Sequence, residues 1–363
     1  MNKPSTAESA EDRLIARYFK PLATHPGAFG LMDDAAVIVP PAGCDLVLKT
    51  DGVIGGVHFF PDDPPDTVAK KALRMNLSDL AAKGAKPLGF LLALALPKAI
   101  GDAWLAPFAR GLGEDAERFG CPLLGGDTDR TPGPISISIA AFGAVPHGKM
   151  VRRAGASPGD RVVVTGTIGD AALGLLLRRD PAQHWGLDRH QQDYLKARYL
   201  VPEPRNAIAE FLGAYASAAM DVSDGLAGDL AKLCRVSGVA AEIEIARVPL
   251  SDAARAALAS EASGQRGQSK VRAPDTRPEP GSSARAALAN EPALIETIVT
   301  GGDDYEVLAC VPPGKVEALR RQASAAGVAV TEIGTVAAGQ GEARFLDRNG
   351  KPLALAHPSF SHF

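Results

Sequence analysis

The sequence predicts a two-domain α/β protein, and three observations lead to this prediction. The chain has 363 residues, 46% of them hydrophobic, which is enough for two hydrophobic cores. Strand-like apolar runs alternate with segments of helical spacing in both halves of the chain. Around residues 152–160 the composition becomes rich in turn-forming residues. We therefore expect an N-terminal domain over residues 1–148 and a C-terminal α/β domain over residues 149–363.

In the N-terminal domain, the apolar pattern alternates between the helical period and the strand period. The expected elements, in order, are a helix over 10–19, strands over 35–39 and 46–51, a helix from residue 66, a strand over 88–96, a helix over 103–119, a short strand that ends in Leu123-Leu124-Gly125-Gly126-Asp127, and a strand over 135–145. The strand over 46–51 should stop at Thr50 and Asp51 and open into a loop with three glycines. A strand that ends this way suits function better than packing, because glycine lets the backbone approach a ligand closely.

The C-terminal domain begins with a strand from Arg161, followed by a helix through Leu177. A strand-turn-helix unit follows over residues 219–230, and an acidic segment over 298–307 should lie between two strands. The six residues at 254–259 recur at 284–289, and a polar stretch rich in Gly, Ser and Pro separates the two copies. We predict a disordered duplicated insertion over about 254–290, with one copy of the short helix docked and no role in chemistry.

Composition and charge exclude several classes of function. The net charge is -3 and no dense run of Lys or Arg occurs, so we expect no nucleic-acid partner. The four cysteines are far apart and form no C-x-x-C pair, which is typical of small buried side chains in a reducing compartment. The N-terminus lacks an apolar signal segment, and the longest apolar run is too short to span a bilayer. A soluble cytoplasmic protein without a membrane partner is expected.

Aspartates recur at strand ends and in glycine-bearing turns of both halves. They are Asp33 and Asp34, Asp51, Asp79, Asp127 and Asp129, Asp221 and Asp224, and Asp303 and Asp304. Any one of them has an ordinary explanation, because Asp is common in turns and at helix N-caps. If they converge, their repulsion requires protons or cations. Mg²⁺ fits, since it takes carboxylate oxygens and bridges nucleotide phosphates. We expect these acids to hold metal ions that bind a nucleotide triphosphate.

Other residues allow both a structural and a functional interpretation. His58 follows a double glycine and either is buried or meets a ligand, and Arg153 is either a solvated loop charge or a phosphate contact. Ser223 can cap the helix that begins near Asp224, which would also direct that helix terminus at an anion. Residues 143–149 match a Walker A loop except for the methionine that follows the lysine, but the next segment is turn-forming rather than helical. We reject the Walker A interpretation.

Several of these segments together resemble the thiamine-phosphate kinase family, of the superfamily that includes aminoimidazole ribonucleotide synthetase. They occur in the family order across nearly the whole chain. The matching segments are Asp33-Asp34-Ala35-Ala36, Thr50-Asp51 through His58-Phe59, Asn76-Leu77-Ser78-Asp79, Gly125-Gly126-Asp127-Thr128, Arg153-Ala154-Gly155, Asp221-Val222-Ser223-Asp224-Gly225 and Gly301-Gly302-Asp303-Asp304-Tyr305-Glu306.

The resemblance implies direct in-line transfer of the γ-phosphoryl group of ATP to thiamine monophosphate, giving thiamine diphosphate. It implies that several Mg²⁺ ions are held by Asp34, Lys49, Thr50, Asp51, Asp79, Asp127, Asp221 and Asp224. ATP would be contacted by Gly126, Asp127, Arg153 and Ser223, and the thiamine phosphate by His58, Asp303 and Phe360. It also implies the two-domain fold of that superfamily and a homodimer in which N-terminal sheets pair.

Three positions depart from the family pattern. Met32 stands where glycine is usual, and Asp303 stands where glutamate is usual. Lys49 replaces a serine, so it can either ligate a metal through its backbone carbonyl or supply a cation's charge itself. Two alternatives remain open. One is a synthetase of the purine-pathway type, and the other is a non-catalytic nucleotide-binding protein whose metal-bound acids stabilise the fold.

Overall fold

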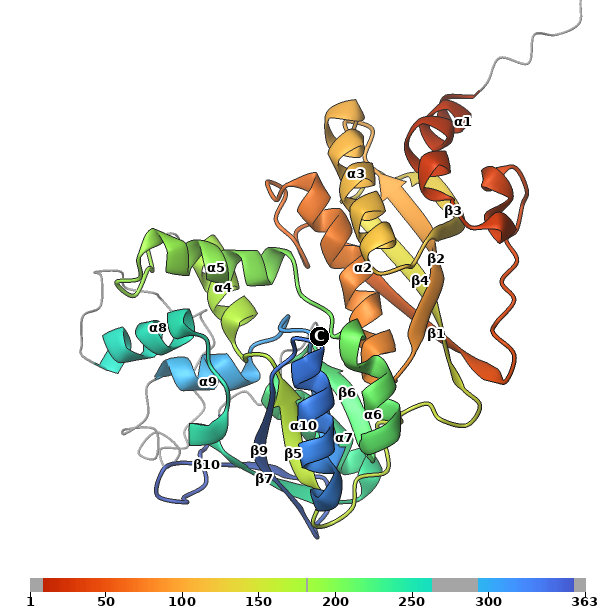
Figure 1. Ribbon diagram of the computed structural model, residues 1–363. Helices are drawn as coiled ribbons and strands as arrows, with labels where there is room; N and C mark the ends of the chain where they lie inside the picture. The colour runs from red at the N-terminus through yellow and green to blue at the C-terminus, as the bar shows by residue number, and fades with distance from the viewer. Residues whose placement is uncertain (1–8, 181, 263–292, 356–363) are drawn as a thin grey trace, which may run out of the picture. The chain divides into compact units, whose positions relative to one another are not determined.

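The computed structural model describes residues 9–180, 182–262 and 293–355. The chain divides into two compact units: residues up to 150 except 81–84 form the first, and residues 81–84 with 151 onward form the second. Figure 1 shows the helices and strands of each unit. In the described part of the chain, no helix is both long and apolar enough to cross a membrane.

The first unit is a four-stranded sheet with two long helices on one face. The strands are β1 (Cys44–Ile54), β2 (Lys86–Leu96), β3 (Leu123–Arg130) and β4 (Ser136–Pro146), in the order β1-β4-β2-β3. The helices are α2 (Pro65–Ala82) and α3 (Asp102–Arg118). Alternate strand residues such as Val47, Leu92 and Ile139 are buried. The other face carries exposed apolar side chains, among them Leu46 and Leu48.

A buried ion pair joins the two long helices of this unit. Arg74 on α2 donates from Nε and Nη2 to the two carboxylate oxygens of Asp115 on α3, at 2.6 and 2.8 Å. This bidentate geometry fixes one helix relative to the other. Before the sheet come α1 (Ala10–Leu14), a π-helical turn (Ile15–Phe19) and two 3₁₀ segments (Lys20–Leu22 and Pro26–Leu31). The second 3₁₀ segment contacts β3, and the π-helical turn contacts α3.

The second unit is a six-stranded mixed sheet in the order β10-β7-β9-β5-β8-β6. Its strands are β5 (Arg161–Thr165), β6 (Ala218–Val222), β7 (Ala240–Glu244), β8 (Glu306–Val311), β9 (Val330–Ala337) and β10 (Ala343–Leu346). Its helices are α4 (Asp170–Arg179), α5 (Arg189–Leu200), α6 (Ala209–Tyr215), α7 (Leu226–Ser237), α8 (Asp252–Ala262), α9 (Ala293–Thr300) and α10 (Val316–Ala325).

Both faces of the second sheet are covered. On β5, Val162 and Val164 belong to a core that includes α4, α7, α8 and α9, whereas Val163 belongs to a second core with α6 and α10. The near-continuous apolar runs of β5, β6 and β8 follow from this burial on both faces. The predicted α/β class is confirmed in both units.

Three predictions about individual elements are wrong. Residues 35–39 form no strand, and Val37 and Val39 are exposed. Strand β1 does not stop at Thr50 and Asp51 but continues to Ile54, because β4 pairs with it along its whole length. The acidic segment over 298–307 does not lie between two strands, because its first three residues end helix α9, which contacts helices α4 and α7. For β1 the deciding partner is a strand far away in the sequence.

The duplicated six-residue segment is described only in its first copy. Residues 254–259 lie within α8, where Ala254 and Ala257 are buried in the core of the second unit. The second copy, at 284–289, lies outside the described residues, as does the polar stretch between the copies.

Candidate active site

A cavity of about 1000 Å³ lies on the open face of the first sheet. Apolar side chains such as Phe19, Leu91 and Phe142 form part of its wall. Asp34, Thr50 and Asp127 line it as well and supply oxygen atoms. Cavities of this size, mostly apolar with a few polar groups, are typical of small-molecule sites. The structure thus brings three of the predicted metal ligands to one cavity.

The strand register explains why Thr50 and Asp127 share this cavity. Thr50 pairs with Ala140, which pairs with Leu91, which in turn pairs with Gly125 on the far edge strand. The neighbouring set of paired residues across the four strands, two positions along on the same face, ends in Asp127. Side chains in neighbouring rows of one face point the same way. Four strands therefore place a hydroxyl from one edge and a carboxylate from the other on the same surface.

Gly126 has a structural reason to be glycine. A Cβ at this position would lie 1.9 Å from the backbone oxygen of Leu92, so any side chain would force β2 and β3 apart. The residue is exposed, and its neighbour Asp127 is exposed too. The close approach of the two strands keeps the backbone beside Asp127 open to a ligand.

A second group of charged residues lies between β1 and α2. The Lys49 ammonium is 3.0 Å from Oδ1 of Asp51 and 2.7 Å from Oδ2 of Asp79. Burial acts to lower the pKa of Lys49, but the carboxylates of Asp79 and Asp51 outweigh it and hold that pKa above its usual value. Three predicted metal-site residues are thus joined by an ion-pair network, and the cation in it is a side chain.

His58 is held in the turn that follows β1. Its Nδ1 accepts a hydrogen bond from the backbone N–H of Ile54 at 3.1 Å, and its own backbone N–H donates to the Ile54 carbonyl at 2.9 Å. Because Nδ1 accepts, the neutral ring carries its proton on Nε2. The half-buried ring is therefore oriented by the backbone.

In the second unit, two loops lie backbone to backbone and bring three predicted residues together. Asp303 donates its backbone N–H to the carbonyl of Ser223 at 2.9 Å, which also brings Asp224 close. A Cβ at Gly302 would lie 2.4 Å from the Ser223 carbonyl oxygen. Asp303 adopts a positive φ of 74°, a conformation that non-glycine residues rarely take. Asp221, predicted with them, is the second-last residue of β6 and is buried.

Two residues to which the sequence interpretation assigned no role hold the Ser223–Asp224 loop. Asp229 on α7 is buried, and its Oδ2 accepts from the backbone N–H groups of Ser223 and Asp224, each at 2.9 Å. Lys232, one turn later, donates to Asp229 at 2.9 Å and also to Asp224. Burial raises the pKa of Asp229 against the opposing effect of Lys232. Ser223 does not cap α7, because the helix begins at Leu226 after Gly225.

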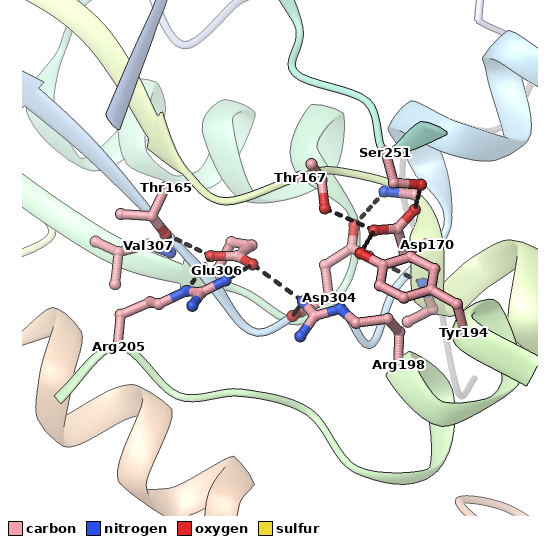
Figure 2. Close-up of polar contacts among 12 residues, drawn as sticks. Thr165, Thr167, Asp170, Tyr194, Arg198, Arg205, Ser251, Asp304, Glu306 and Val307 are labelled. Atoms are coloured by element: carbon pink, nitrogen blue, oxygen red, sulfur yellow. Dashed lines mark hydrogen bonds and ion pairs between the residues drawn. The ribbon is translucent and has the colours of Figure 1, made fainter. Parts of the chain in front are cut away.

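Figure 2 shows a buried polar network that fixes the other loop. Glu306 is fully buried and accepts from Arg198, Arg205 and Thr165; the Arg205 Nε and Thr165 Oγ1 contacts are each 2.6 Å. Asp304 is also fully buried and accepts from the backbone N–H of Gly169 at 2.6 Å, at the start of α4. The side chains on both sides of Tyr305 are thereby held inside the unit, which leaves Asp303 at the half-buried end of the loop.

Arg153 lies far from Ser223 along the same unit. Its backbone oxygen accepts from Oγ of Ser237, the last residue of α7, whereas Ser223 precedes the first turn of that helix. A helix of 12 residues is about 18 Å long. The exposed Arg153 and the half-buried Ser223, both predicted ATP contacts, are separated by roughly that length within this unit.

The donor set at the cavity is compatible with Mg²⁺. The side chains of Asp34, Thr50 and Asp127 offer hard oxygen atoms of the kind that this ion prefers. Within residues 9–180, 182–262 and 293–355, no three His, Cys, Asp or Glu side chains gather closely enough to form a complete metal site by themselves. The site would therefore be completed by phosphate oxygens and water, as is usual for Mg²⁺ at nucleotide sites.

Comparison with known proteins decides the family. The family model "AIR synthase related protein, N-terminal domain" matches residues 32–145, and "AIR synthase related protein, C-terminal domain" matches residues 157–347. Thiamine-monophosphate kinase of Caulobacter vibrioides is 40% identical over 354 residues, covering 97% of this chain and 91% of the relative. The Escherichia coli K12 enzyme is 36% identical, covering 97% and 98%. The chain belongs to the thiamine-monophosphate kinase family.

Solved structures of this family have the same fold as this chain. Thiamine-monophosphate kinase from Stenotrophomonas maltophilia superposes with a TM-score of 0.75 at 33% identity, covering 96% of this chain and 98% of that one. The structure of AaThiL complexed with AMPPCP and TMP has a TM-score of 0.69 at 29% identity, covering 93% and 97%. The expected two-domain fold and the expected family are both confirmed.

The family motifs account for most of the candidate site, but one predicted residue stays without structural description. Phe360, the predicted aromatic contact to thiamine phosphate, lies outside the described residues. Sequence reasoning also gave no role to Asp229, Lys232, Arg198 or Arg205. The available signal for Asp229 and Lys232 was their helical spacing of three, which places both on one face of α7 directly after the Asp224 motif.

Proposed function

We propose that this protein phosphorylates thiamine monophosphate to thiamine diphosphate, with ATP as the phosphoryl donor and Mg²⁺ as the cofactor. The observation that carries the proposal is the relative AaThiL, whose structure is a complex with AMPPCP and TMP and which aligns over 93% of this chain. The cavity with Asp34, Thr50 and Asp127 supports it, because it offers oxygen ligands beside a space large enough for a nucleotide.

In the proposed reaction, a phosphate oxygen of thiamine monophosphate attacks the γ-phosphorus of ATP, and the bond to the β-γ bridging oxygen breaks to release ADP. The acceptor is already an anion, so no side chain is needed to remove a proton. Bound Mg²⁺ would neutralise the phosphate charges and align the two reacting groups. The protein's own task is positioning, and no covalent phosphoenzyme is involved.

We carry the remaining family roles to this chain as part of the proposal. Gly126, Arg153 and Ser223 contact ATP, and His58 and Asp303 contact the substrate phosphate. The backbone hydrogen bond that orients the His58 ring supports its role, because a neutral ring protonated on Nε2 is a hydrogen-bond donor of the kind that anions accept from. The strained backbone of Asp303 supports a functional role for that residue, since such strain is common at ligand sites.

The test is incubation of the full chain with Mg²⁺, ATP and thiamine monophosphate, followed by chromatography for thiamine diphosphate and ADP. Free thiamine serves as a parallel acceptor that should give no product, because it lacks the phosphate. The proposal predicts equal amounts of thiamine diphosphate and ADP. If ATP stays intact with both acceptors, the chain is a non-catalytic nucleotide-binding protein and the proposal is wrong.

We also propose that the active form is a homodimer in which the N-terminal sheets of two copies pair with each other. Leu46 and Leu48 on the edge strand β1 are 42% and 65% exposed, and edge strands with exposed apolar residues tend to pair. Leu48→Glu should convert a dimer to a monomer in analytical ultracentrifugation. Val236→Glu is the matched control, because Val236 is an exposed apolar residue of the second unit. If Leu48→Glu sediments with the same particle mass as a dimeric parent, the proposed pairing is wrong.

A further inference from the structure

Strand β1 and helix α2 meet at three charged side chains, and one of them is a cation. The Lys49 ammonium lies between Asp51 and Asp79, at 3.0 and 2.7 Å. The three side chains are only 28%, 28% and 19% exposed, so this is a partly desolvated network rather than a surface ion pair. Asp51 and Asp79 are both predicted metal ligands, and Lys49 is one of the positions at which the sequence departs from the pattern of the family that it resembles.

We propose that Lys49 is a built-in cation that takes the place of one divalent ion between Asp51 and Asp79. The consequence is that this chain binds one metal ion fewer than the same chain would with serine at position 49. The inference rests on the proposed function, because it concerns the metal ions that this function requires. It does not concern the oxygen donors of the cavity, which line a separate surface.

Geometry excludes the simultaneous presence of a metal ion at the same pair of oxygens. Mg²⁺ binds carboxylate oxygens at about 2.0–2.1 Å, so an ion on Asp51 Oδ1 and Asp79 Oδ2 would occupy the space of the ammonium. The two cations would also repel each other strongly at that separation, because the site is partly shielded from water. Lys49 lies on the same strand as Asp51, so its side chain supplies the positive charge between the two carboxylates and no ion from solution is needed there.

A similar arrangement occurs in the second unit. The Lys232 ammonium contacts both Asp229 and the predicted metal ligand Asp224. Here too a lysine side chain bridges two carboxylates beside a predicted phosphate-binding loop. The use of lysine as a bridging cation is thus not peculiar to position 49.

The experiment measures binding of Mn²⁺ alone to the full chain, with free Mn²⁺ followed by its electron paramagnetic resonance signal. The variants are Lys49→Ser, which leaves the two carboxylates without the ammonium, and Lys49→Arg, which keeps the charge. Lys70→Ser is the matched control, because Lys70 lies on α2 and pairs with Glu114 rather than with a predicted metal ligand. Circular dichroism and the melting temperature establish that each variant is folded.

We expect Lys49→Ser to bind one additional Mn²⁺ per chain, or to bind Mn²⁺ at least about tenfold more tightly than the parent. Lys49→Arg and Lys70→Ser should both follow the parent isotherm. A Lys49→Ser isotherm identical to that of the parent would overturn the proposal, and so would additional Mn²⁺ bound by Lys49→Arg. If Lys49→Ser does not fold, Lys49→Met is measured in its place and should show the same gain in Mn²⁺ binding. A Lys49→Met isotherm identical to that of the parent would then overturn the proposal.

Failure of this inference can be told apart from failure of the proposed function. Conversion of thiamine monophosphate by the parent chain tests the function without reference to position 49. A chain that makes thiamine diphosphate while Lys49→Ser binds Mn²⁺ like the parent would keep the function and discard the role of Lys49.

Discussion

At the residue scale, the position along a strand decides which acid lines the cavity. Asp127 and Asp129 are two positions apart on β3 and both exposed, so both lie on the same face of the sheet. Asp127 lines the cavity, whereas Asp129 receives a hydrogen bond from the backbone N–H of Arg130 at 2.7 Å and does not line it. Of these two aspartates, only Asp127 is predicted from the sequence as a metal ligand.

Asp127→Asn should lower turnover of thiamine monophosphate by at least about 100-fold, because it removes the negative charge that would hold the metal ion on the nucleotide phosphates. The melting temperature should stay close to that of the parent, since the side chain is exposed. Steady-state kinetics at saturating Mg²⁺ measures the effect. Asp129→Asn is the control and should keep turnover within about twofold. Equal losses in both variants would remove the assignment of Asp127.

The buried carboxylate Glu306 depends on its arginine partners. Arg205→Met leaves Glu306 with less compensation in a site that excludes water, so the free energy of unfolding should fall by about 3–5 kcal/mol. Arg320→Met removes a half-buried arginine from its pair with the exposed Glu317 on α10 and should cost only about 0–1 kcal/mol. Urea denaturation compares the two variants. A loss below about 1 kcal/mol for Arg205→Met would show that Glu306 is not held as described.

At the scale of elements, the position of Asp303 depends on two loops that touch through their backbones. The loop after β6 and the loop before β8 approach so closely that Gly225, at a φ of 104°, and Gly302 have no room for a side chain. The α4 terminus adds a third element, because Asp304 accepts from its backbone N–H groups. Backbone packing therefore places Asp303 beside Ser223.

Gly302→Ala tests this packing. The added Cβ would lie 2.4 Å from the Ser223 carbonyl oxygen, so the loops must separate, and the free energy of unfolding should fall by about 1–3 kcal/mol. Because Asp303 follows directly, KM for thiamine monophosphate should rise as well. Gly314→Ala is the control, since no atom lies within 4 Å of a Cβ at that position, and it should be neutral or stabilising by about 0.4–1 kcal/mol. Similar stabilities of both variants would argue against close packing.

At the scale of the whole molecule, the two units cover their sheets differently. The first leaves one face of its sheet open, and the second covers both faces with helices. The open face carries both the cavity and the exposed apolar residues of β1. The features on which we base the proposed oxygen donors and the proposed dimer therefore lie on the first unit's sheet, and the second unit contributes the ordered loops that carry Ser223 and Asp303.

The cysteines report on burial in both units. Cys121, Cys234 and Cys310 are buried, and Cys44 is half-buried; burial raises the pKa of Cys121 to about 12 and that of Cys234 to about 11. At pH 8 a thiol reagent should modify about one cysteine per native chain and all four after denaturation. Absorbance of the released thiolate counts the sites. Rapid reaction of three or four cysteines in the native protein would contradict the described cores.

The sequence by itself determined the α/β class, the family and the identity of the acidic and glycine-rich motifs. Periodicity and motif order can be recognised in the sequence without knowledge of the partner of each strand. Only the tertiary structure decided that β1 continues to Ile54, that residues 35–39 form no strand and that 298–300 are helical, because those outcomes depend on distant neighbours. It alone showed the ammonium of Lys49 between Asp51 and Asp79, since Asp79 lies on helix α2, far from Lys49 in the sequence.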